Sequence, residues 1–446
     1  MSTSHAQPVT AVVVGAGHRA VLLAEYALAH PDELRIVGVA DPNEFRRNRV
    51  AAQHNIPAER CFASAEELAA VPQFADAAID GTMDQEHVPT AIALLDGGYN
   101  VLLEKPIATR QEDMMRLADK VVETGKTVMI CHVLRYAPFY AEVRRRVSIG
   151  EIGDIISLQT VENVSYHHTV TSHVRGKWRR KGEHNITSLM AKCCHDTDLI
   201  SWMKTGIAPT RVSSFGSLMY FRPENAPAGS GTRCMTDCSI ESTCPYSAYK
   251  NYILQDFWGD YVWDCIESKN PTRESKIESL RTINPYGKCV WHCDNDVVDH
   301  QTVIVEFEDG STASHNLNQN NARPCRSIHL VGTKGEIQGV MEEGKFVIRH
   351  ADAREGGEFT EEWITLEVAD DMHGGGDMRL VQDFVRVLRG ESPSISTTDL
   401  VDSINGHLIG FGADTSRIEG TVIPISVPKG LKTARAQTCT CCGCTE

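Results

Sequence analysis

The first residues that could do chemistry are a glycine pair and a later aspartate. The run Gly15-Ala16-Gly17-His18-Arg19-Ala20 follows a short β-branched apolar stretch, and Asp41 ends the next such stretch. Gly15 permits a tight turn, Gly17 lets the backbone approach a pyrophosphate, and Ala20 allows a helix to pack closely on a strand. A carboxylate at Asp41 binds a ribose 2′-hydroxyl and repels a 2′-phosphate. The pattern predicts a dinucleotide site that favours NAD over NADP.

Two alternatives remain open for this site. Arg46 and Arg47 lie close to Asp41 in the sequence and would attract a 2′-phosphate, which weakens the preference for NAD. A glycine turn followed by a solvated aspartate is also a purely structural arrangement. Under the binding interpretation, the residues expected at the coenzyme are Gly15, Ala16, Gly17, His18, Arg19, Asp41, Thr82, His87, Glu104 and Lys105.

A second group of ionisable side chains lies within 185–205, whose apolar residues recur at helical spacing. Lys192 and His195 are three residues apart and therefore share one face of that helix. A neutral imidazole can take the proton of a hydroxyl at physiological pH, and ammonium groups can stabilise an alkoxide. Nearby lysines would lower the pKa of His195, and mutual crowding would lower the lysine pKa values too, so either type could be the base. A core histidine bound to a backbone carbonyl is the alternative.

Aromatic and planar cationic side chains gather shortly before this helix. Aromatic faces and guanidinium donors suit the C–H faces and hydroxyls of a sugar ring. An ordinary surface loop with an aromatic anchor is an equally good interpretation. The candidate substrate residues of this segment are Tyr166, His168, Arg175 and Trp178. Asp196 is a further candidate, with pairing to Lys192 as its alternative.

Fifteen cysteines form a third group, and six of them lie between 234 and 293. Cys234, Cys238, Cys244 and Cys293 could hold a structural zinc in an irregular segment, although their spacing is not that of a zinc ribbon. Reduced, buried thiols are the alternative. Four more cysteines crowd 439–446, in a tail expected to be disordered from residue 429 onward.

The elements that must position these residues alternate between strand and helix over the first 133 residues. Ser64-Ala65-Glu66-Glu67 and Thr109-Arg110-Gln111-Glu112 have the form of capping boxes that start helices. Strands are predicted at 11–14, 34–40, 75–80, 101–104 and 127–132. This rhythm predicts a doubly wound parallel sheet, a Rossmann domain, over residues 8–133.

An α+β domain for substrate binding and oligomerisation is predicted over residues 134–428. Apolar and polar residues alternate in its runs, which predicts a large, mostly antiparallel open sheet with one face on helices. Glu308-Asp309-Gly310 predicts a hairpin, and helices are expected at 139–147, 378–388 and 400–411. Strands are predicted at 155–163, 211–218, 297–307, 311–317, 327–331, 345–349 and 363–368.

Composition excludes several classes of protein. The chain has 446 residues, a net charge of −15 and a pI near 5.6. Such a charge repels phosphate backbones and anionic lipids, and no apolar run approaches the length of a membrane span. The start lacks the basic flank and apolar run of a signal peptide. We expect a cytoplasmic globular protein that binds neither nucleic acid nor membranes.

The chain resembles the glucose–fructose oxidoreductase / inositol dehydrogenase / rhizopine-catabolism (Gfo/Idh/MocA) family in three motifs. They are the glycine turn, Val101-Leu102-Leu103-Glu104-Lys105-Pro106 and Cys194-His195-Asp196-Thr197-Asp198-Leu199. The resemblance runs from about 12 to 427 and includes Gly150-Glu151-Ile152-Gly153. In that family the lysine of Glu-Lys-Pro lies beside the nicotinamide and the reacting hydroxyl, which implies that role for Lys105. Many members carry an aspartate where this chain has Ala191, so the resemblance leaves the chemistry to Lys105, Lys192 and His195.

Segments 132–136, 162–179, 191–196 and 373–377 resemble a sugar and glycoside dehydrogenase subgroup of the family. By this resemblance Arg135 and Tyr136 face the substrate cleft, and the free face of the sheet forms a homodimer or homotetramer. Some relatives oxidise the 3-hydroxyl of glycosides, and their keto products are prone to eliminate the aglycone.

Three functions are therefore compatible with the sequence. The leading hypothesis is an NAD-dependent dehydrogenase that oxidises a secondary hydroxyl of a sugar, cyclitol or glycoside, with C3 as a candidate position. A redox-assisted glycoside cleavage that recycles NAD is the second hypothesis. A ligand-sensing regulator without catalysis is the third, and loss of Lys105 or His195 would favour it, but both are present.

Overall fold

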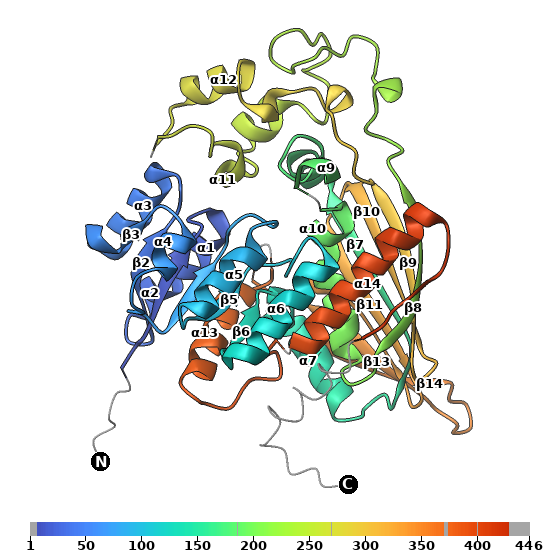
Figure 1. Cartoon of the computed structure of the whole chain (residues 1–446). Helices are drawn as coiled ribbons and strands as arrows, with labels where there is room; N and C mark the ends of the chain where they lie inside the picture. The colour runs from blue at the N-terminus through green and yellow to red at the C-terminus, as the bar shows by residue number, and fades with distance from the viewer. Residues whose placement is uncertain (1–6, 185, 269, 370–372, 399, 428–446) are drawn as a thin grey trace.

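A computed structural model describes residues 7–184, 186–268, 270–369, 373–398 and 400–427, so the predicted tail at 429–446 lies outside the described residues. The chain builds two sheets with helices around them (Figure 1). The first sheet has six strands, all parallel, in the order β3-β2-β1-β4-β5-β6. Its strands are β1 (Val9–Val14), β2 (Leu34–Ala40), β3 (Cys61–Phe62), β4 (Ala77–Asp80), β5 (Asn100–Leu103) and β6 (Val128–Ile130). The predicted Rossmann sheet is confirmed.

Helices cover both faces of this sheet, as the alternating pattern requires. They are α1 (His18–Ala24), α2 (Tyr26–Ala29), α3 (Glu44–His54), α4 (Ala65–Ala69), α5 (His87–Asp96) and α6 (Gln111–Thr124). The predicted cap at Ser64 is confirmed, because its hydroxyl accepts from the Glu67 amide. The predicted cap at Thr109 is wrong: α6 starts one residue later, after Arg110, whose side chain makes no capping bond.

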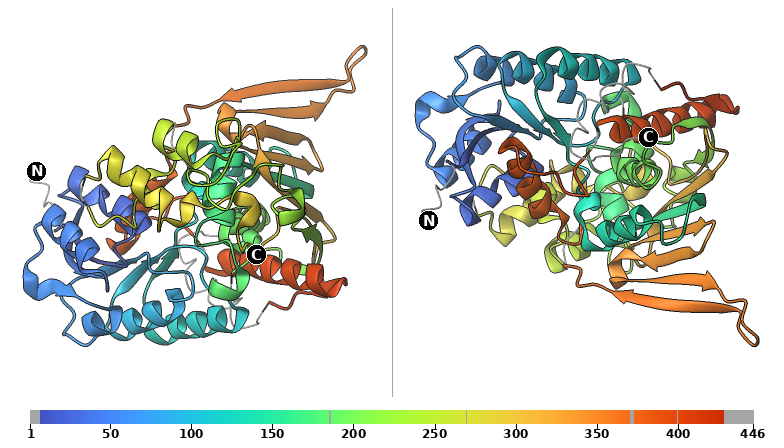
Figure 2. Two further views of the ribbon diagram at one scale, coloured as in Figure 1. Left: turned by 90° about the horizontal axis from the view of Figure 1, so that it is seen from above. Right: turned by 90° about the horizontal axis from the view of Figure 1, so that it is seen from below.

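The second sheet has nine strands in the order β14-β13-β12-β11-β7-β10-β9-β8-β15. All neighbours are antiparallel except β7 and β10, which run parallel, so the predicted, mostly antiparallel sheet is confirmed. Its strands are β7 (Ile155–Ser165), β8 (Pro209–Ser217), β9 (His300–Phe307), β10 (Thr312–Asn321), β11 (Cys325–Gly332), β12 (Glu336–Val340), β13 (Lys345–Ala351), β14 (Phe359–Thr365) and β15 (Ile423–Pro424). In Figure 2 the β13–β14 hairpin projects from the body of the molecule.

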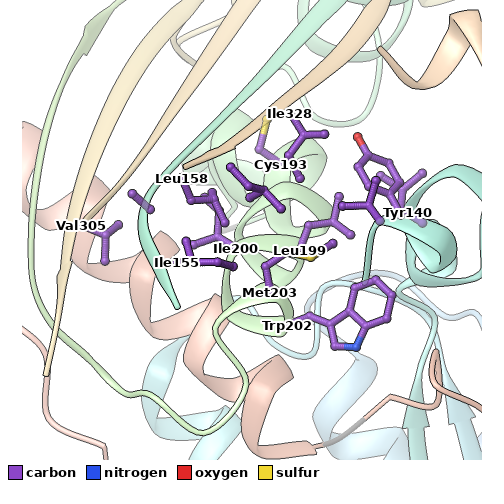
Figure 3. Close-up of a cluster of buried hydrophobic side chains, with 14 of the residues drawn as sticks. Tyr140, Ile155, Leu158, Cys193, Leu199, Ile200, Trp202, Met203, Val305 and Ile328 are labelled. Atoms are coloured by element: carbon purple, nitrogen blue, oxygen red, sulfur yellow. The ribbon is translucent and has the colours of Figure 1, made fainter. Parts of the chain in front are cut away.

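One helix, α10 (Ser188–Met203), lies at the centre of the second core. All but one of its sixteen residues are buried, and Lys192 is the exception. In Figure 3 its side chains Leu199, Ile200 and Met203 point toward strand residues such as Leu158. A helix that is buried on every face has no freedom to shift, because protein interiors are close-packed.

Two C-terminal helices return to the first sheet after the second sheet is complete. Leu380 and Phe384 of α13 (Gly376–Leu388) are buried in the same cluster as Val13 and Leu23. The long helix α14 (Leu400–Glu419) packs on α10 and β8 and also contacts α6 and β6. The two sheets are therefore joined by helices from a distant part of the chain as well as by the connection near residue 134.

The connection from β8 to β9 spans residues 218–299, and its described residues contribute no strand to either sheet. It lies above the first domain in Figure 1, and the view from above in Figure 2 shows it in yellow over the blue N-terminal part. The remaining helices are α7 (Pro138–Ser148), α8 (Tyr166–Thr169), α9 (Lys181–His184), α11 (Gly259–Val262) and α12 (Arg273–Arg281). Within the described ranges, no helix has the length and apolar character that crossing a membrane requires.

Candidate active site

A cavity of about 910 Å³ lies between the two sheets. On one side it is bounded by the residues that follow the carboxyl ends of β1, β2, β4 and β5, which is where open α/β sheets bind ligands. On the other side it is bounded by α10 and by the ends of β7 and β11. The sequence-predicted site residues that line it are Gly15, Gly17, His18, Arg19, Asp41, Thr82, His87, Glu104, Lys105, His168, Trp178, Lys192 and His195.

The glycine turn has the shape that a dinucleotide needs. Gly15 has a φ of +74°, and a Cβ there would lie 2.7 Å from the backbone nitrogen of Thr82. Gly17 has open space where a Cβ would point, and it caps α1 without a side-chain hydrogen bond. The first amides of α1 are therefore available to an anion. These observations fit a bound pyrophosphate.

The carboxylate of Asp41 stiffens this turn. One oxygen accepts from the Ala16 amide at 2.6 Å and the other from the Asn43 amide at 2.7 Å. Each carboxylate oxygen has a second lone pair, so Asp41 can still accept from a ribose hydroxyl. The residues present thus fit NAD in both its phosphate and its ribose parts.

Three predicted coenzyme residues have strong partners within the protein. Arg19 donates to Glu104 at 2.9 Å and to Asp377 of α13 at 2.6 Å. The two ring nitrogens of His87 lie 2.6 Å from the Pro106 carbonyl oxygen and 3.2 Å from that of Thr82. These contacts hold the loops after β4 and β5 in position around the cavity.

Lys105 and His195 meet at one face of α10. The Lys105 ammonium donates to the main-chain oxygen of Ala191 at 3.0 Å. His195 follows Ala191 by four residues, so it lies on the same helical face, and both Lys105 and His195 line the cavity. The ammonium also lies 5.7 Å from the ring centre of Trp178. The structure therefore brings together the two segments that the resemblance connects.

Burial and neighbouring cations keep His195 neutral. Burial lowers its pKa well below the usual value of 6.5, and the charges of Lys105 and His373 lower it further. Burial also lowers the pKa of Lys192, against the opposing effect of Glu162, whose Oε1 lies 3.4 Å from the Lys192 ammonium. A neutral imidazole and a weakened ammonium at one cavity provide two groups that can accept a proton.

His373 is a site residue that the sequence analysis did not select. It lines the cavity, its ring centre is 5.6 Å from that of His195, and its Nδ1 lies 2.8 Å from an oxygen of Asp377. The His373-Gly374-Gly375-Gly376-Asp377 motif was a signal for it, because the glycine turn before α13 brings the ring beside the carboxylate of Asp377 in the first turn of that helix.

Comparison with known proteins concerns the family and the fold. Residues 9–132 match the family model GFO_IDH_MocA, described as an oxidoreductase family with an NAD-binding Rossmann fold. The match covers the first domain, which is therefore similar to the NAD-binding domain of this family. The predicted resemblance is thereby confirmed, and so is the prediction of an NAD-binding oxidoreductase.

Two Bacillus subtilis proteins illustrate the relatives within this family. The putative oxidoreductase YteT is 24% identical over 71% of this chain and 76% of its own length. The scyllo-inositol 2-dehydrogenase (NAD(+)) is 29% identical, but the alignment covers 32% of this chain and 42% of that protein. The second alignment is therefore confined to less than half of either chain.

Solved structures share the fold along nearly the whole chain. The WlbA dehydrogenase from Bordetella pertussis, in complex with NADH and UDP-GlcNAcA, covers 95% of this chain and all of its own, with a TM-score of 0.63 and 17% identity. An NAD binding oxidoreductase from Klebsiella pneumoniae reaches a TM-score of 0.68 at 13% identity and covers 94% of this chain. At such identities the likeness concerns the fold.

Five predicted substrate residues do not line the cavity. Tyr136 donates to Asp383 at 3.0 Å, and Asp196 lies 3.4 Å from Arg326. The ring of Tyr166 packs 6.4 Å from that of Tyr246. The remaining two, Arg135 and Arg175, are fully buried in polar networks.

Arg175 anchors the 218–299 segment instead of contacting the cavity. Its guanidinium donates to the main-chain oxygens of Lys288 at 2.7 Å and Tyr246 at 2.8 Å. It also donates to the hydroxyl of Tyr252 and the sulfur of Cys234. All four partners belong to the 218–299 segment, so one side chain fixes several of its turns to the second domain.

The cysteines predicted to bind zinc do not gather as a ligand set. Among the described residues, the side chains that bring three ligand atoms within 4.8 Å of one another are Cys193, Asp196 and His315. Arg326 lies 3.4 Å from Asp196 and already supplies positive charge to that group. The thiols of Cys234 and Cys293 have other partners, the first with Arg175 and the second with the Cys289 carbonyl at 3.2 Å.

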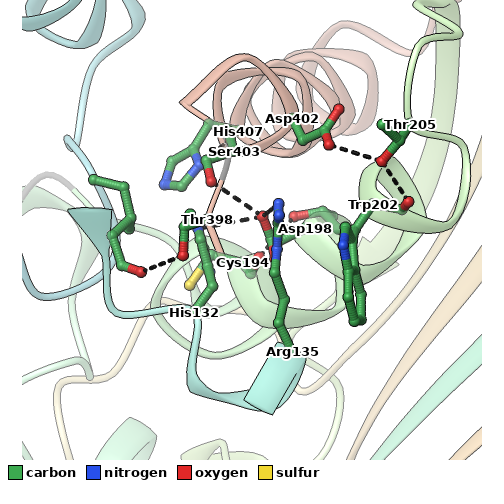
Figure 4. Close-up of polar contacts among 12 residues, drawn as sticks. His132, Arg135, Cys194, Asp198, Trp202, Thr205, Thr398, Asp402, Ser403 and His407 are labelled. Carbon is green, nitrogen blue, oxygen red and sulfur yellow. Dashed lines mark hydrogen bonds and ion pairs between the residues drawn. The ribbon is translucent and has the colours of Figure 1, made fainter. Parts of the chain in front are cut away.

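Arg135 forms a buried pair with Asp198, shown in Figure 4. Two parallel hydrogen bonds of 2.7 Å join them, and both side chains are at most 1% exposed. Burial alone would raise the pKa of Asp198, but the guanidinium outweighs it and holds that pKa below its usual value. His132 Nε2 lies 3.6 Å from Oδ1 of Asp198, and the Ser403 hydroxyl donates to that atom at 3.3 Å.

We predict that Asp198→Asn destabilises the protein by about 3–5 kcal/mol, because it leaves the buried charge of Arg135 unpaired. The thermal midpoint, followed by circular dichroism, should fall by roughly 10 °C. Asp352→Asn is the matched control, since it breaks a two-bond pair with the exposed Arg354 and should leave the midpoint nearly unchanged. Equal midpoints for the two variants would contradict the assignment.

We also predict a steep loss of stability in mild acid. Burial lowers the pKa of four histidines far below 6.5: to about 3 for His132 and His173, and to about 4 for His315 and His407. Because the folded-state values are depressed, the unfolded chain takes up protons first. The contribution of these neutral histidines to the free energy of unfolding is therefore complete above pH 6.5 and falls as the pH drops toward 4.

The measurement is the thermal midpoint at pH 7.5, 6.5, 5.5 and 4.5. Each pKa unit is worth about 1.4 kcal/mol per site, so four sites together rival the stability of a whole domain. The steepest fall should lie between pH 6.5 and 4.5, and the slope should be shallower in His407→Gln. A midpoint that does not change over this range would show that these imidazoles are not held neutral.

Proposed function

We propose that the chain is an NAD-dependent dehydrogenase that oxidises a secondary hydroxyl of a sugar, cyclitol or glycoside. The observation that carries the proposal is the contact of the Lys105 ammonium with the Ala191 main-chain oxygen, one helical turn before His195. This contact lies in the cavity that also contains the glycine turn and Asp41. Two groups for proton chemistry thus share one space with a dinucleotide cradle.

The coenzyme half of the cavity belongs to the first domain. Bound NAD supplies the hydride acceptor. The free amides at the start of α1 hold the diphosphate, Gly17 leaves room for it, and Asp41 accepts from the adenosine ribose.

The proton half of the reaction belongs to Lys105, His195 and Lys192. Oxidation of an alcohol releases a proton from its oxygen, and the Lys105 ammonium lowers the cost of the resulting alkoxide. His195 is the preferred acceptor of that proton, because burial and Lys105 keep its imidazole neutral. Lys192 is the alternative acceptor, since burial lowers its pKa as well.

The lining of the other half suits a cyclic polyol. The aromatic residues His168 and Trp178 line this half, and the Trp178 indole is fixed by a 2.7 Å hydrogen bond to Asp84. Glu162 and Arg326 add charged hydrogen-bonding groups. Such a mixture of aromatic faces and convergent polar groups is typical of sugar sites. The scyllo-inositol 2-dehydrogenase is named for a cyclic polyol, and the WlbA structure contains a UDP-linked sugar.

A homo-oligomer formed through the free face of the second sheet is part of this proposal. Phe215 of β8 is 71% exposed, and Ile304 of β9 and Ile156 of β7 are each about half exposed. Apolar side chains on one sheet face are typical of an interface between copies.

We predict that Lys105→Ala lowers kcat with an inositol or glycoside substrate by about 10²–10³-fold, because an alkoxide-stabilising charge is lost. Absorbance of NADH at 340 nm measures turnover, and NADH fluorescence measures binding. Binding should change only a few-fold, since the α1 amides and Asp41 remain. Arg116→Ala, on an exposed side chain of α6, is the control. Wild-type turnover by Lys105→Ala would refute the proposed role.

A second candidate function, redox-assisted glycoside cleavage, is favoured by the presence of His373 beside His195. Oxidation at C3 acidifies the C2 proton, and elimination then breaks the glycosidic bond and leaves a double bond between C1 and C2. Water adds to this bond, with its oxygen at C1 and a solvent proton at C2, and the hydride returns from NADH to C3. This sequence moves a proton from carbon as well as one from oxygen, and two neighbouring imidazoles could serve the two.

We predict for this candidate that glycoside cleavage in D₂O with sub-stoichiometric NAD incorporates deuterium at C2, measured by NMR. His373→Asn should suppress the label more than it suppresses NADH binding. Cleavage without label would exclude elimination, and NADH formation without cleavage would leave the simple dehydrogenase.

A further inference from the structure

The 218–299 segment reaches across the cavity and touches the first domain at the coenzyme half. Arg46 of α3 pairs with Asp264, and the side-chain amide of Asn43 donates to Glu267 at 3.3 Å. A third contact joins His18 Nδ1 to an oxygen of Asp260 at 3.5 Å. These contacts flank the two features that cradle the dinucleotide, since His18 follows Gly17, and Asn43 and Arg46 follow Asp41.

The segment also contributes directly to the cavity wall. Asp260, Tyr261 and Asp264 line it together with His18 and Arg46. The Tyr261 ring centre is 5.2 Å from that of His18. In Figures 1 and 2 the segment around α11 overlies the first domain. A dinucleotide along the glycine turn and Asp41 would therefore lie beneath it.

We propose that Asp264 is a coenzyme-selectivity residue, acting from outside the Rossmann domain to exclude NADP. The proposal rests on the proposed function, because it assumes that the cradle holds a dinucleotide. Arg46 lies in the first turn of α3, just after Asp41, where a free guanidinium would bind a 2′-phosphate. In the structure that guanidinium is paired with Asp264 instead.

The charges around Arg46 strengthen the selection. Asp41 and Asp264 both line the coenzyme half, and Glu267 lies beside Asn43. Arg47 adds one positive charge, and its guanidinium donates to the Asp41 main-chain oxygen at 2.6 Å. A dianionic 2′-phosphate beside Arg46 would meet the carboxylates of Asp41 and Asp264, and the Arg46 guanidinium is already paired. An NAD ribose brings no charge and leaves the Arg46–Asp264 pair intact.

The Arg46–Asp264 pair is also a weak contact between the first domain and the 218–299 segment. The Arg46 side chain is 32% exposed and that of Asp264 43%, so solvent screens their attraction. Elsewhere the segment is fixed firmly to the second domain by Arg175 and by the buried cluster in which Val170 and Val174 pack with Tyr246. The segment is thus anchored on the second domain and held only loosely over the coenzyme, which lets a dinucleotide enter and leave.

The test measures the dissociation constants of NADH and NADPH by nicotinamide fluorescence, without substrate, for the wild type and Asp264→Asn. We expect NADPH to bind Asp264→Asn about tenfold more tightly than it binds the wild type, because one charge-assisted hydrogen bond to phosphate becomes available. NADH affinity should change less than threefold. Glu274→Gln, an exposed carboxylate of α12, is the matched control and should change neither value.

The double variant Arg46→Ala/Asp264→Asn identifies the cause. If the freed guanidinium binds the phosphate, the gain in NADPH affinity should disappear in the double variant. Unchanged NADPH affinity in Asp264→Asn, with a wild-type thermal midpoint, overturns the proposal, and so does a gain that persists without Arg46. Failure of the wild type to bind either dinucleotide would overturn the proposed function itself, which is a distinct result.

Discussion

The hydrogen bond from the Lys105 ammonium to the Ala191 main-chain oxygen is the contact on which the site depends. It joins the end of β5 in the first domain to the helix α10 of the second. A main-chain oxygen is a fixed target, because α10 is buried along almost its whole length. The position of the ammonium relative to His195 is therefore set by the packing of a core helix.

That burial has an electrostatic consequence. The helix that fixes His195 also removes it from water, and burial is the largest cause of its lowered pKa. The first domain then adds the charge of Lys105. The same packing that aligns the two groups thus selects the neutral imidazole, which is the form that accepts a proton. Geometry and protonation state have one structural origin.

The sequence predicted what local patterns determine. The glycine turn, Asp41 and the six-stranded sheet follow from runs of adjacent residues, and Lys192 and His195 share a face because helical spacing is regular. Arg135 and Arg175 could not be placed, since their partners Asp198 and Lys288 are 63 and 113 positions away. A buried guanidinium in a polar network and one in a binding site look alike until such partners are known.

The two walls of the cavity differ in how firmly they are held. The first wall is locked by long-range pairs such as Arg19 with Glu104 and Asp377, which tie α13 to the glycine turn. The cover over the coenzyme is held by half-exposed polar contacts such as Arg46 with Asp264. Rigid walls keep the reacting groups aligned, whereas a weakly held cover permits exchange of a ligand as large as a dinucleotide. The division explains why the catalytic candidates come from core elements and the selectivity candidate comes from an irregular segment.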